Sequence, residues 1–82
     1  TAAPRSRFQV PRSIRGGVVV VDVEDGSAAD RADLEAGDVI LEVNRRGVDS
    51  ADAFGRALGQ AGKRMFLLVA RGGRTRFLVL ER

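Results

Sequence analysis

The side chains that could perform chemistry are few, and their spacing does not form a catalytic set. Ser27, Ser50 and Thr75 each have a structural use, as a helix cap or as a strand residue. No histidine is present to activate these hydroxyls, and the only lysine, Lys63, follows a predicted helix end where it is solvated. There is also no cysteine, which removes thiolate chemistry and thiolate zinc sites. We therefore expect no catalytic residues and no enzymatic activity in this chain alone.

Two other patterns approach known binding loops without meeting their spacing. Three acids in residues 22–25 precede Gly26, but a calcium loop needs its glycine one position later and a glutamate at its twelfth position. The glycine pairs at 16–17 and 72–73 lack the following helix of a phosphate loop. We expect neither a metal ion nor a cofactor, and we assign the acidic run to a turn.

Length, composition and charge place bounds on the possible functions. The 82 residues suffice for one small domain, and a composition of 44% hydrophobic and 30% charged residues is typical of a folded globular chain. Residues 1–16 hold four arginines and no acid, residues 17–54 ten acids and three bases, and residues 55–82 seven bases and one acid. This segregation fits polyanions, acidic peptides or another protein as partners, but a plain solvated surface is the simpler interpretation and the one we favour. No apolar run approaches the roughly 20 residues that span a bilayer, so we expect no direct membrane insertion.

Nucleic-acid binding is disfavoured by the aromatic residues. The chain has no tyrosine and no tryptophan. Its four phenylalanines occupy positions that we expect in the core, namely Phe8, Phe54, Phe66 and Phe77. A single-strand binder needs exposed aromatic rings between its basic residues, so we expect no nucleic-acid partner.

The strands are indicated by short apolar runs. The central one is 39–43, entered by Gly37-Asp38 and closed by Asn44, with Val39, Leu41 and Val43 expected on one face and Ile40 on the other. A second strand is predicted at 8–10 and ends at Pro11. A third is predicted at 17–23, where four consecutive valines indicate burial on both faces. The last two, 65–70 and 75–80, are joined at Gly72-Gly73 as a two-residue hairpin.

Two helices complete the predicted elements. Ser27 caps a short helix that extends to about Ala32, and Leu34 is expected to fill the core beneath it. Ser50 caps a longer helix over 51–61, whose apolar positions follow one helical face. Gly62 is the expected C′ residue of that helix, and Gly55 and Gly59 lie inside it. These two glycines indicate either a ligand that approaches closely or simple packing against a strand.

The order of these elements predicts the fold class. We expect an α+β domain that is mostly β, a partly open barrel or sandwich of five to six strands capped by two helices. Residues 1–7 are expected to form an N-terminal linker and residues 8–82 the domain itself.

The motifs are similar to those of a known family. The run 17–29, the segment Leu34-Glu35-Ala36-Gly37-Asp38-Val39-Ile40-Leu41-Glu42-Val43-Asn44, the Val48-Asp49-Ser50 turn, the second helix and the final hairpin resemble a PDZ domain. The resemblance covers about residues 8–82. The segment before Gly17 and the ending Leu80-Glu81-Arg82 resemble the second, C-terminal PDZ domain of bacterial HtrA or Deg-type serine proteases.

This resemblance implies a binding mode. A PDZ domain takes up an extended peptide, usually a C-terminus, as an added strand at a sheet edge. The residues implied here are Arg5, Ser6 and Arg7 in the carboxylate loop, Phe8, Gln9 and Val10 in the edge strand, and Ala51, Phe54, Gly55 and Leu58 on the helix. Ala51 stands where many members carry a histidine that selects serine or threonine, so we expect preference for an apolar residue.

The carboxylate loop departs from the family pattern. The family has apolar-Gly-apolar where this chain has Ser6-Arg7-Phe8, and arginine is less free than glycine to let backbone amides converge on an anion. Either Arg5 or Arg7 adds charge that holds the carboxylate, or the pocket is degenerate and the domain serves assembly. Asp33 and Arg45 also stand where glycine is frequent, which predicts local strain without a change of fold.

The resemblance thus implies a non-catalytic, peptide-binding module of a periplasmic HtrA-type (DegP-like) serine protease engaged in protein quality control. Its expected partners are extended or C-terminal peptides of client proteins, together with the protease domain or other PDZ domains of the parent protein. The alternative is a structural or regulatory module that mediates oligomer assembly or protease gating.

Overall fold

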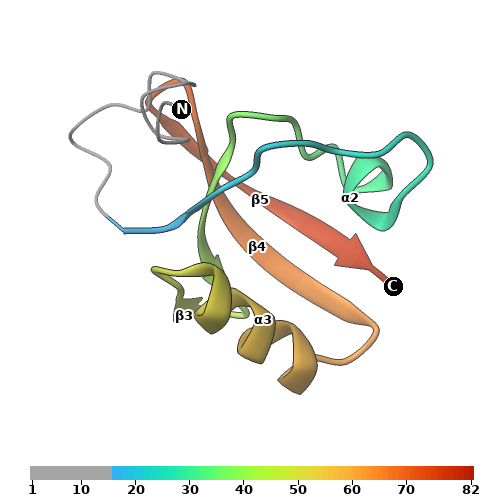
Figure 1. The fold of residues 1–82 in the computed structure, drawn as a ribbon, viewed down its shortest axis with the longest axis vertical. Helices are drawn as coiled ribbons and strands as arrows, with labels where there is room; N and C mark the ends of the chain where they lie inside the picture. The colour runs from blue at the N-terminus through green and yellow to red at the C-terminus, as the bar shows by residue number, and fades with distance from the viewer. Residues whose placement is uncertain (1–15) are drawn as a thin grey trace.

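The computed structural model of the chain describes residues 16–82. Five strands and two helices follow one another along this part of the chain (Figure 1). Their bounds are β1 Val18–Val19, α2 Ala28–Arg31, β2 Val39–Val43, β3 Arg46–Gly47, α3 Ala51–Gln60, β4 Arg64–Arg71 and β5 Arg74–Glu81. The predicted strand at 8–10 and the proposed boundary between residues 7 and 8 lie outside the described residues.

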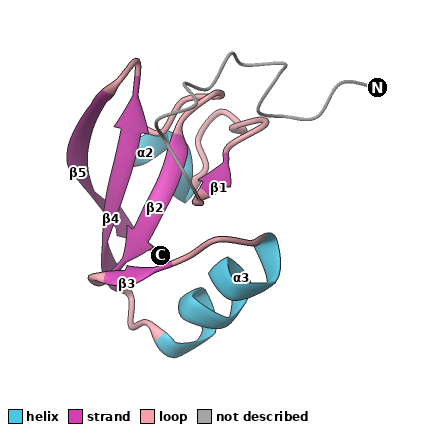
Figure 2. Cartoon of the chain, turned by 90° about the vertical axis from the view of Figure 1, so that its left-hand side faces the viewer, coloured by secondary structure: helices cyan, strands magenta, loops and turns pink. Residues whose placement is uncertain are grey.

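One antiparallel sheet organises the molecule. Its strands follow the order β1-β2-β4-β5, and β3 pairs with β2 beside this path (Figure 2). The long β4–β5 hairpin is paired along its whole length, from Arg64 opposite Glu81 to Arg71 opposite Arg74. Gly72 and Gly73 form its two-residue loop with φ of 59° and 81°, as expected for a hairpin turn of this length. The predicted class, mostly β with an open sheet and two short helices, is confirmed.

The core lies where the inward faces of β2 and β4 meet the segments around the helices. Met65, Leu67 and Val69 alternate along β4 and are fully buried. Leu34, which follows α2, is buried in the same cluster, as its position after the predicted helix indicated. Figure 1 shows α2 and α3 well separated along the long axis of the molecule, so each covers a different part of this core.

The predicted faces of the central strand are wrong, because β2 contains a bulge. Its pairing with β4 shifts between Ile40, opposite Val69, and Glu42, opposite Leu68. A bulge adds one residue to one strand and reverses the alternation of side chains beyond it. Ile40 and Val43 therefore both join the core cluster, whereas Leu41 is only half-buried.

The expected burial of the valine run on both faces is also wrong. Only Val18–Val19 is a strand, and it forms the end of the sheet within the described residues. Val18 and Val20 pack against the core, but Val21 is 42% exposed. Four consecutive valines indicate a strand, but they do not show whether a second layer covers it.

The caps at the helix starts are as predicted. The Ser27 hydroxyl accepts a hydrogen bond from the Asp30 amide at 3.1 Å, and the Ser50 hydroxyl accepts one from the Ala53 amide at 3.0 Å. Helix α3 ends close to the predicted point, because Ala61 is its C-cap and Gly62 therefore stands at C′. Gly62 does not have the positive φ that is typical of a glycine at this position.

Candidate functional site

Helix α3 packs against the core along one side only. Phe54, Ala57, Leu58 and Ala61 are half-buried against the core cluster, and no residue of the helix is fully buried. Their spacing of three and four residues places them on one helical face. The opposite face, which includes Arg56, is exposed. The helix therefore lies at the surface and contacts the core through one face only.

The four helical residues predicted for a peptide site divide into two kinds. Phe54 and Leu58 are half-buried and pack on the core, while Ala51 and Gly55 are exposed. Ala51, Gly55 and Leu58 form one row along the helix, because they are separated by four and three residues. Among residues 16–82, no atom outside the helix lies within 4 Å of the position that a Cβ would occupy at Gly55.

Neither internal glycine of α3 packs against a neighbouring strand of the described structure. The Cβ position at Gly59 is as open as that at Gly55, which argues against the strand-packing explanation for these two glycines. A glycine within a helix costs about 1 kcal/mol relative to alanine, and here no described contact offsets that cost. Space is therefore available beside Gly55 on the predicted groove side of the helix.

The other wall of the predicted groove lies outside the described residues. This applies to Arg5, Ser6, Arg7, Phe8, Gln9 and Val10, so the structure neither brings them to α3 nor separates them from it. Within the described part of the chain, β1 ends the sheet and pairs only with β2, through Val18 opposite Ile40 and Val19 opposite Val39. The location of the carboxylate loop thus stays a prediction.

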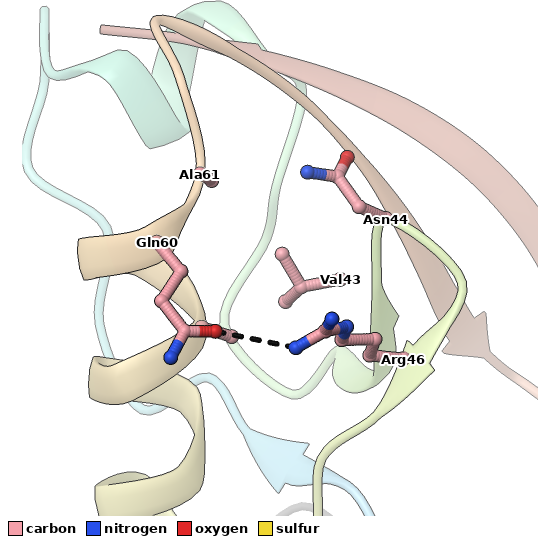
Figure 3. A pocket seen from close by; sticks show the side chains of 6 residues that line it. Val43, Asn44, Arg46, Gln60 and Ala61 are labelled. Atoms are coloured by element: carbon pink, nitrogen blue, oxygen red, sulfur yellow. Dashed lines mark hydrogen bonds between the residues drawn. The ribbon is translucent and has the colours of Figure 1, made fainter.

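A small pocket lies between the C-terminal half of α3 and the β2–β3 turn (Figure 3). Its volume is about 220 Å³, and its lining residues are Val43, Asn44, Arg46, Ala57, Gln60 and Ala61. The Arg46 guanidinium donates a hydrogen bond of 3.2 Å to the Gln60 side-chain oxygen across its mouth. This bond ties β3 to α3 and closes the pocket on that side.

The last residue of the sequence holds the end of α3. One guanidinium nitrogen of Arg82 donates to the carbonyls of Leu58 at 2.8 Å and Ala61 at 2.7 Å, and more weakly to Gly62 at 3.2 Å. The Arg82 amide also donates to the Lys63 carbonyl at 2.7 Å. The last carbonyls of a helix lack internal partners and attract a cation. Arg82 meets this need from a distant point in the sequence.

A buried ion pair, which the sequence did not reveal, fixes the segment between α2 and β2. Asp38 is 1% exposed, and its two carboxylate oxygens accept hydrogen bonds of 2.7 Å from the Arg71 guanidinium. Arg71 also donates to the Asp33 carbonyl and lies 3.1 Å from the Glu35 carboxylate. The hydrogen bond to Asp38 raises the pKa of Arg71, despite the opposing effect of desolvation.

The expectation that all phenylalanines lie in the core is wrong for two of them. Phe66 is 53% exposed and Phe77 is 66% exposed. Both project from the face of the β4–β5 hairpin opposite to the one that carries Met65 and Leu67. The sequence shows the alternation along this hairpin, but not that its outer face lacks a covering layer in the described structure. Exposed aromatic rings are therefore present, contrary to the expectation on which a nucleic-acid partner was disfavoured.

The described residues provide neither a metal-ligand cluster nor a helix suited to a membrane. Within residues 16–82, no group of three or more acidic side chains is arranged to hold a metal ion. No helix in this part of the chain has the length and apolar character required to cross a bilayer.

Comparison with known families gives a match over most of the described chain. The family profile described as "PDZ domain" matches residues 19–71. A solved HtrA3 PDZ domain, bound to a phage-derived ligand of sequence FGRWV, superposes with a TM-score of 0.77 at 24% identity. That superposition covers 83% of this chain and 61% of the solved chain, and it supports the fold.

Several curated relatives are proteases that are much longer than this chain. A probable periplasmic serine endoprotease, DegP-like, from Chlamydia muridarum is 41% identical over 66 residues, which is 79% of this chain. A serine protease Do-like HtrA from Lactococcus lactis is 43% identical over 53 residues, or 65% of this chain. The magnetosome formation protease MamE of Paramagnetospirillum magneticum is 38% identical over 87 residues, or 89% of this chain. The chain spans only 12–13% of the length of these relatives.

Proposed function

This chain belongs to the PDZ domain family, and we propose that it is the peptide-binding module of a periplasmic serine protease of the HtrA type. PDZ domains are binding modules, which agrees with the absence of a catalytic set in the sequence. The protease parent and the periplasmic location are proposed because the Chlamydia relative carries both in its name.

The proposed mode is addition of a client strand opposite α3. The client peptide pairs with the edge strand Phe8–Val10, and Arg5 to Arg7 surround its terminal carboxylate. Its side chains face Ala51, Phe54, Gly55 and Leu58 of α3. The observation that carries this proposal is the open space at Gly55, beside the exposed Ala51 and the half-buried Leu58.

The same residues suggest which peptides bind. Ala51 offers only a methyl group, and Leu58 presents an apolar side chain, so neither can hydrogen-bond a polar ligand side chain. Burying a polar ligand group there would leave it without a partner, which costs free energy. Apolar C-termini, and exposed apolar segments of unfolded clients, are therefore the proposed ligands.

Titration of the 82-residue chain with a library of C-terminal peptides tests the proposal. Backbone amide shifts at residues 6–10 and 51–58 are expected on binding of apolar C-termini. Gly55→Leu fills the open space and should weaken binding about tenfold, equivalent to about 1.4 kcal/mol. Gly59→Leu, one turn further along the same helix and equally open, is the matched control and should change affinity less than about twofold.

The proposal fails if no peptide perturbs these residues, or if the two glycine variants behave alike. In that case the alternative, a module for oligomer assembly or protease gating, is tested by the assembly state of the parent protease with and without this domain.

A further inference from the structure

A second apolar surface lies on the outer face of the β4–β5 hairpin, away from the row of small residues on α3. Phe66 lies opposite Val79, and Leu68 lies opposite Phe77, so that these four side chains share one face. We call these four residues the hairpin patch. Phe66, Phe77 and Val79 are 53%, 66% and 40% exposed. Exposed apolar side chains that form one contiguous group mark interaction sites more often than scattered ones do.

The hairpin patch is hollowed at one end. A cavity of about 600 Å³ is lined by Asn44, Arg45, Phe66 and Phe77. Its wall is held in place by Asn44, whose amide donates to the Phe66 carbonyl at 2.7 Å and whose side-chain oxygen accepts from the Phe66 amide at 2.8 Å. These two bonds fix the β2–β3 turn beside the first phenylalanine. The volume lies within the range of sites that take a compact ligand group.

Arg45 occupies this turn at a conformational cost. Asn44 and Arg45 form the two-residue loop between Val43 and Arg46, with φ of 50° and 69°. Asparagine followed by glycine is the pair that suits such a loop, because its second residue needs positive φ. Within residues 16–82, the Arg45 guanidinium has no ion pair and no hydrogen bond. An arginine with positive φ that has no polar partner within residues 16–82, and that lines an apolar cavity, is available to pair with a ligand.

Charge favours an anionic occupant from another protein. Among residues 16–82, Arg45 is the one charged residue that lines the cavity, so the cavity attracts an anionic group and repels a cation. Residues 1–15 contain four arginines and no acid, so this segment is a poor occupant on the same ground. The outer face has a second arginine, Arg64, but it is paired with Glu81 at 3.6 Å. One unpaired cation beside an apolar cavity suits a single carboxylate, whereas a nucleic acid would need a row of cations along its backbone.

We propose that the hairpin patch is a second docking site, which takes an acidic and apolar segment of a partner protein. An apolar side chain of that segment enters the cavity between Phe66 and Phe77. A neighbouring aspartate or glutamate forms a charge-assisted pair with Arg45. This site does not use α3, so it stands or falls independently of the peptide groove proposed above.

The test uses two peptides that are acetylated and C-amidated, so that neither offers a terminal carboxylate. The probe is Glu-Leu-Phe-Asp-Leu-Glu, and its neutral counterpart is Gln-Leu-Phe-Asn-Leu-Gln. Titrated into the 82-residue chain at low salt, the acidic probe should shift the amides of Asn44, Arg45, Phe66 and Phe77. Those of residues 51–58 should stay in place. The neutral peptide should bind at least about fivefold more weakly, because the charge pair is lost.

Arg45→Gly separates the role in binding from a role in folding. Glycine suits the left-handed turn position, so this variant should melt at a higher temperature, yet bind the acidic probe at least about fivefold more weakly. The matched control is Arg74→Ser, which removes an equally exposed arginine from the same hairpin outside the cavity and should leave affinity within about twofold. Phe77→Ser should abolish binding of the probe.

Several results would overturn the proposal. They are shifts confined to α3, no shift at millimolar probe, and equal losses in Arg45→Gly and Arg74→Ser. Two others assign the hairpin patch to a different occupant: preferential binding of an oligothymidylate, or concentration-dependent dimerisation in diffusion measurements that Phe77→Ser removes.

Discussion

Arg71 and Asp38 are 33 positions apart in the sequence and form an ion pair. This pair fixes the position of the α2–β2 segment on the sheet. Asp38 is buried, and besides Arg71 it accepts a hydrogen bond from the Glu35 amide at 2.9 Å. The raised pKa of Arg71 means that its contribution is present below the ordinary pKa of arginine and is lost only at more alkaline pH. Arg71 therefore keeps its charge across the neutral range.

Arg71→Met should lower the free energy of unfolding by about 3–5 kcal/mol, because it leaves the Asp38 carboxylate buried without its partner. Urea unfolding followed by circular dichroism measures this loss. Arg64→Met is the matched control, because the ion pair of Arg64 with Glu81 is 3.6 Å long and both side chains are well exposed. That change should cost no more than about 1 kcal/mol. Similar losses in the two variants would show that burial does not govern the importance of the Arg71 pair.

At the level of single residues, the sequence predicts what depends on local backbone and misses what depends on distant neighbours. Asp33 and Arg45 have φ of 68° and 69°, as expected from their positions where glycine is frequent. The ion pair of Asp38 with Arg71 was not predicted, because nothing local in either segment marks the two as partners. The exposure of Phe66 and Phe77 was missed for the same reason, since hydrophobicity alone does not show whether a covering layer exists.

Helix α3 is attached to the rest of the fold through one half-buried face. It has no fully buried residue and two internal glycines, and its C-terminal carbonyls depend on Arg82. Segments with few buried contacts open at a lower free energy than the core does. The wall of the proposed peptide groove therefore belongs to the part of the molecule that can adjust to a ligand.

Arg82→Ala should loosen the end of α3 without unfolding the sheet. Hydrogen bonds to a charged group contribute about 1.5–3 kcal/mol, so amide exchange at Leu58 and Ala61 should accelerate at least about tenfold. Exchange along β4 should change little. Hydrogen exchange followed by NMR distinguishes the two regions. The control is Arg76→Ala, which removes an exposed arginine of β5 that has no ion pair and no side-chain hydrogen bond within residues 16–82. Uniform acceleration across β4 and α3 would contradict a local function for Arg82.

The sequence predicted the elements well, but not the irregularities within and between them. The helix starts at Ser27 and Ser50, the β4–β5 hairpin and its Gly72-Gly73 loop are confirmed. The bulge in β2 was not predicted, because it appears only in the pairing of this strand with β4. The sequence of five residues alone does not show where an extra residue interrupts the alternation of side chains. Gly62 follows the C-cap of α3 as predicted, but the hydrogen bonds from Arg82 to this end of the helix were missed, because an arginine twenty residues later leaves no local signal.

For the molecule as a whole, the final strand is essential although the family match ends before it. The match covers residues 19–71, whereas β5 begins at Arg74 and supplies the buried Leu80. It also pairs with all of β4, which would otherwise expose a long sheet edge. The cooperative unit therefore extends beyond the matched region.

A chain that ends at Arg71 should lose cooperative folding. Proton NMR dispersion and thermal unfolding report this loss. The double variant Arg74→Ser and Arg76→Ser in the full chain controls for the removal of basic charge, and it should keep the dispersion of the parent because both side chains are exposed. A truncated chain with native dispersion and a cooperative transition would show that β5 is dispensable.

The hydrogen bonds from Arg82 to α3 also have a mechanical consequence. One guanidinium links the residue after β5 to the last turn of a helix that has no fully buried residue. A displacement of the chain at Arg82 is therefore passed directly to the end of α3.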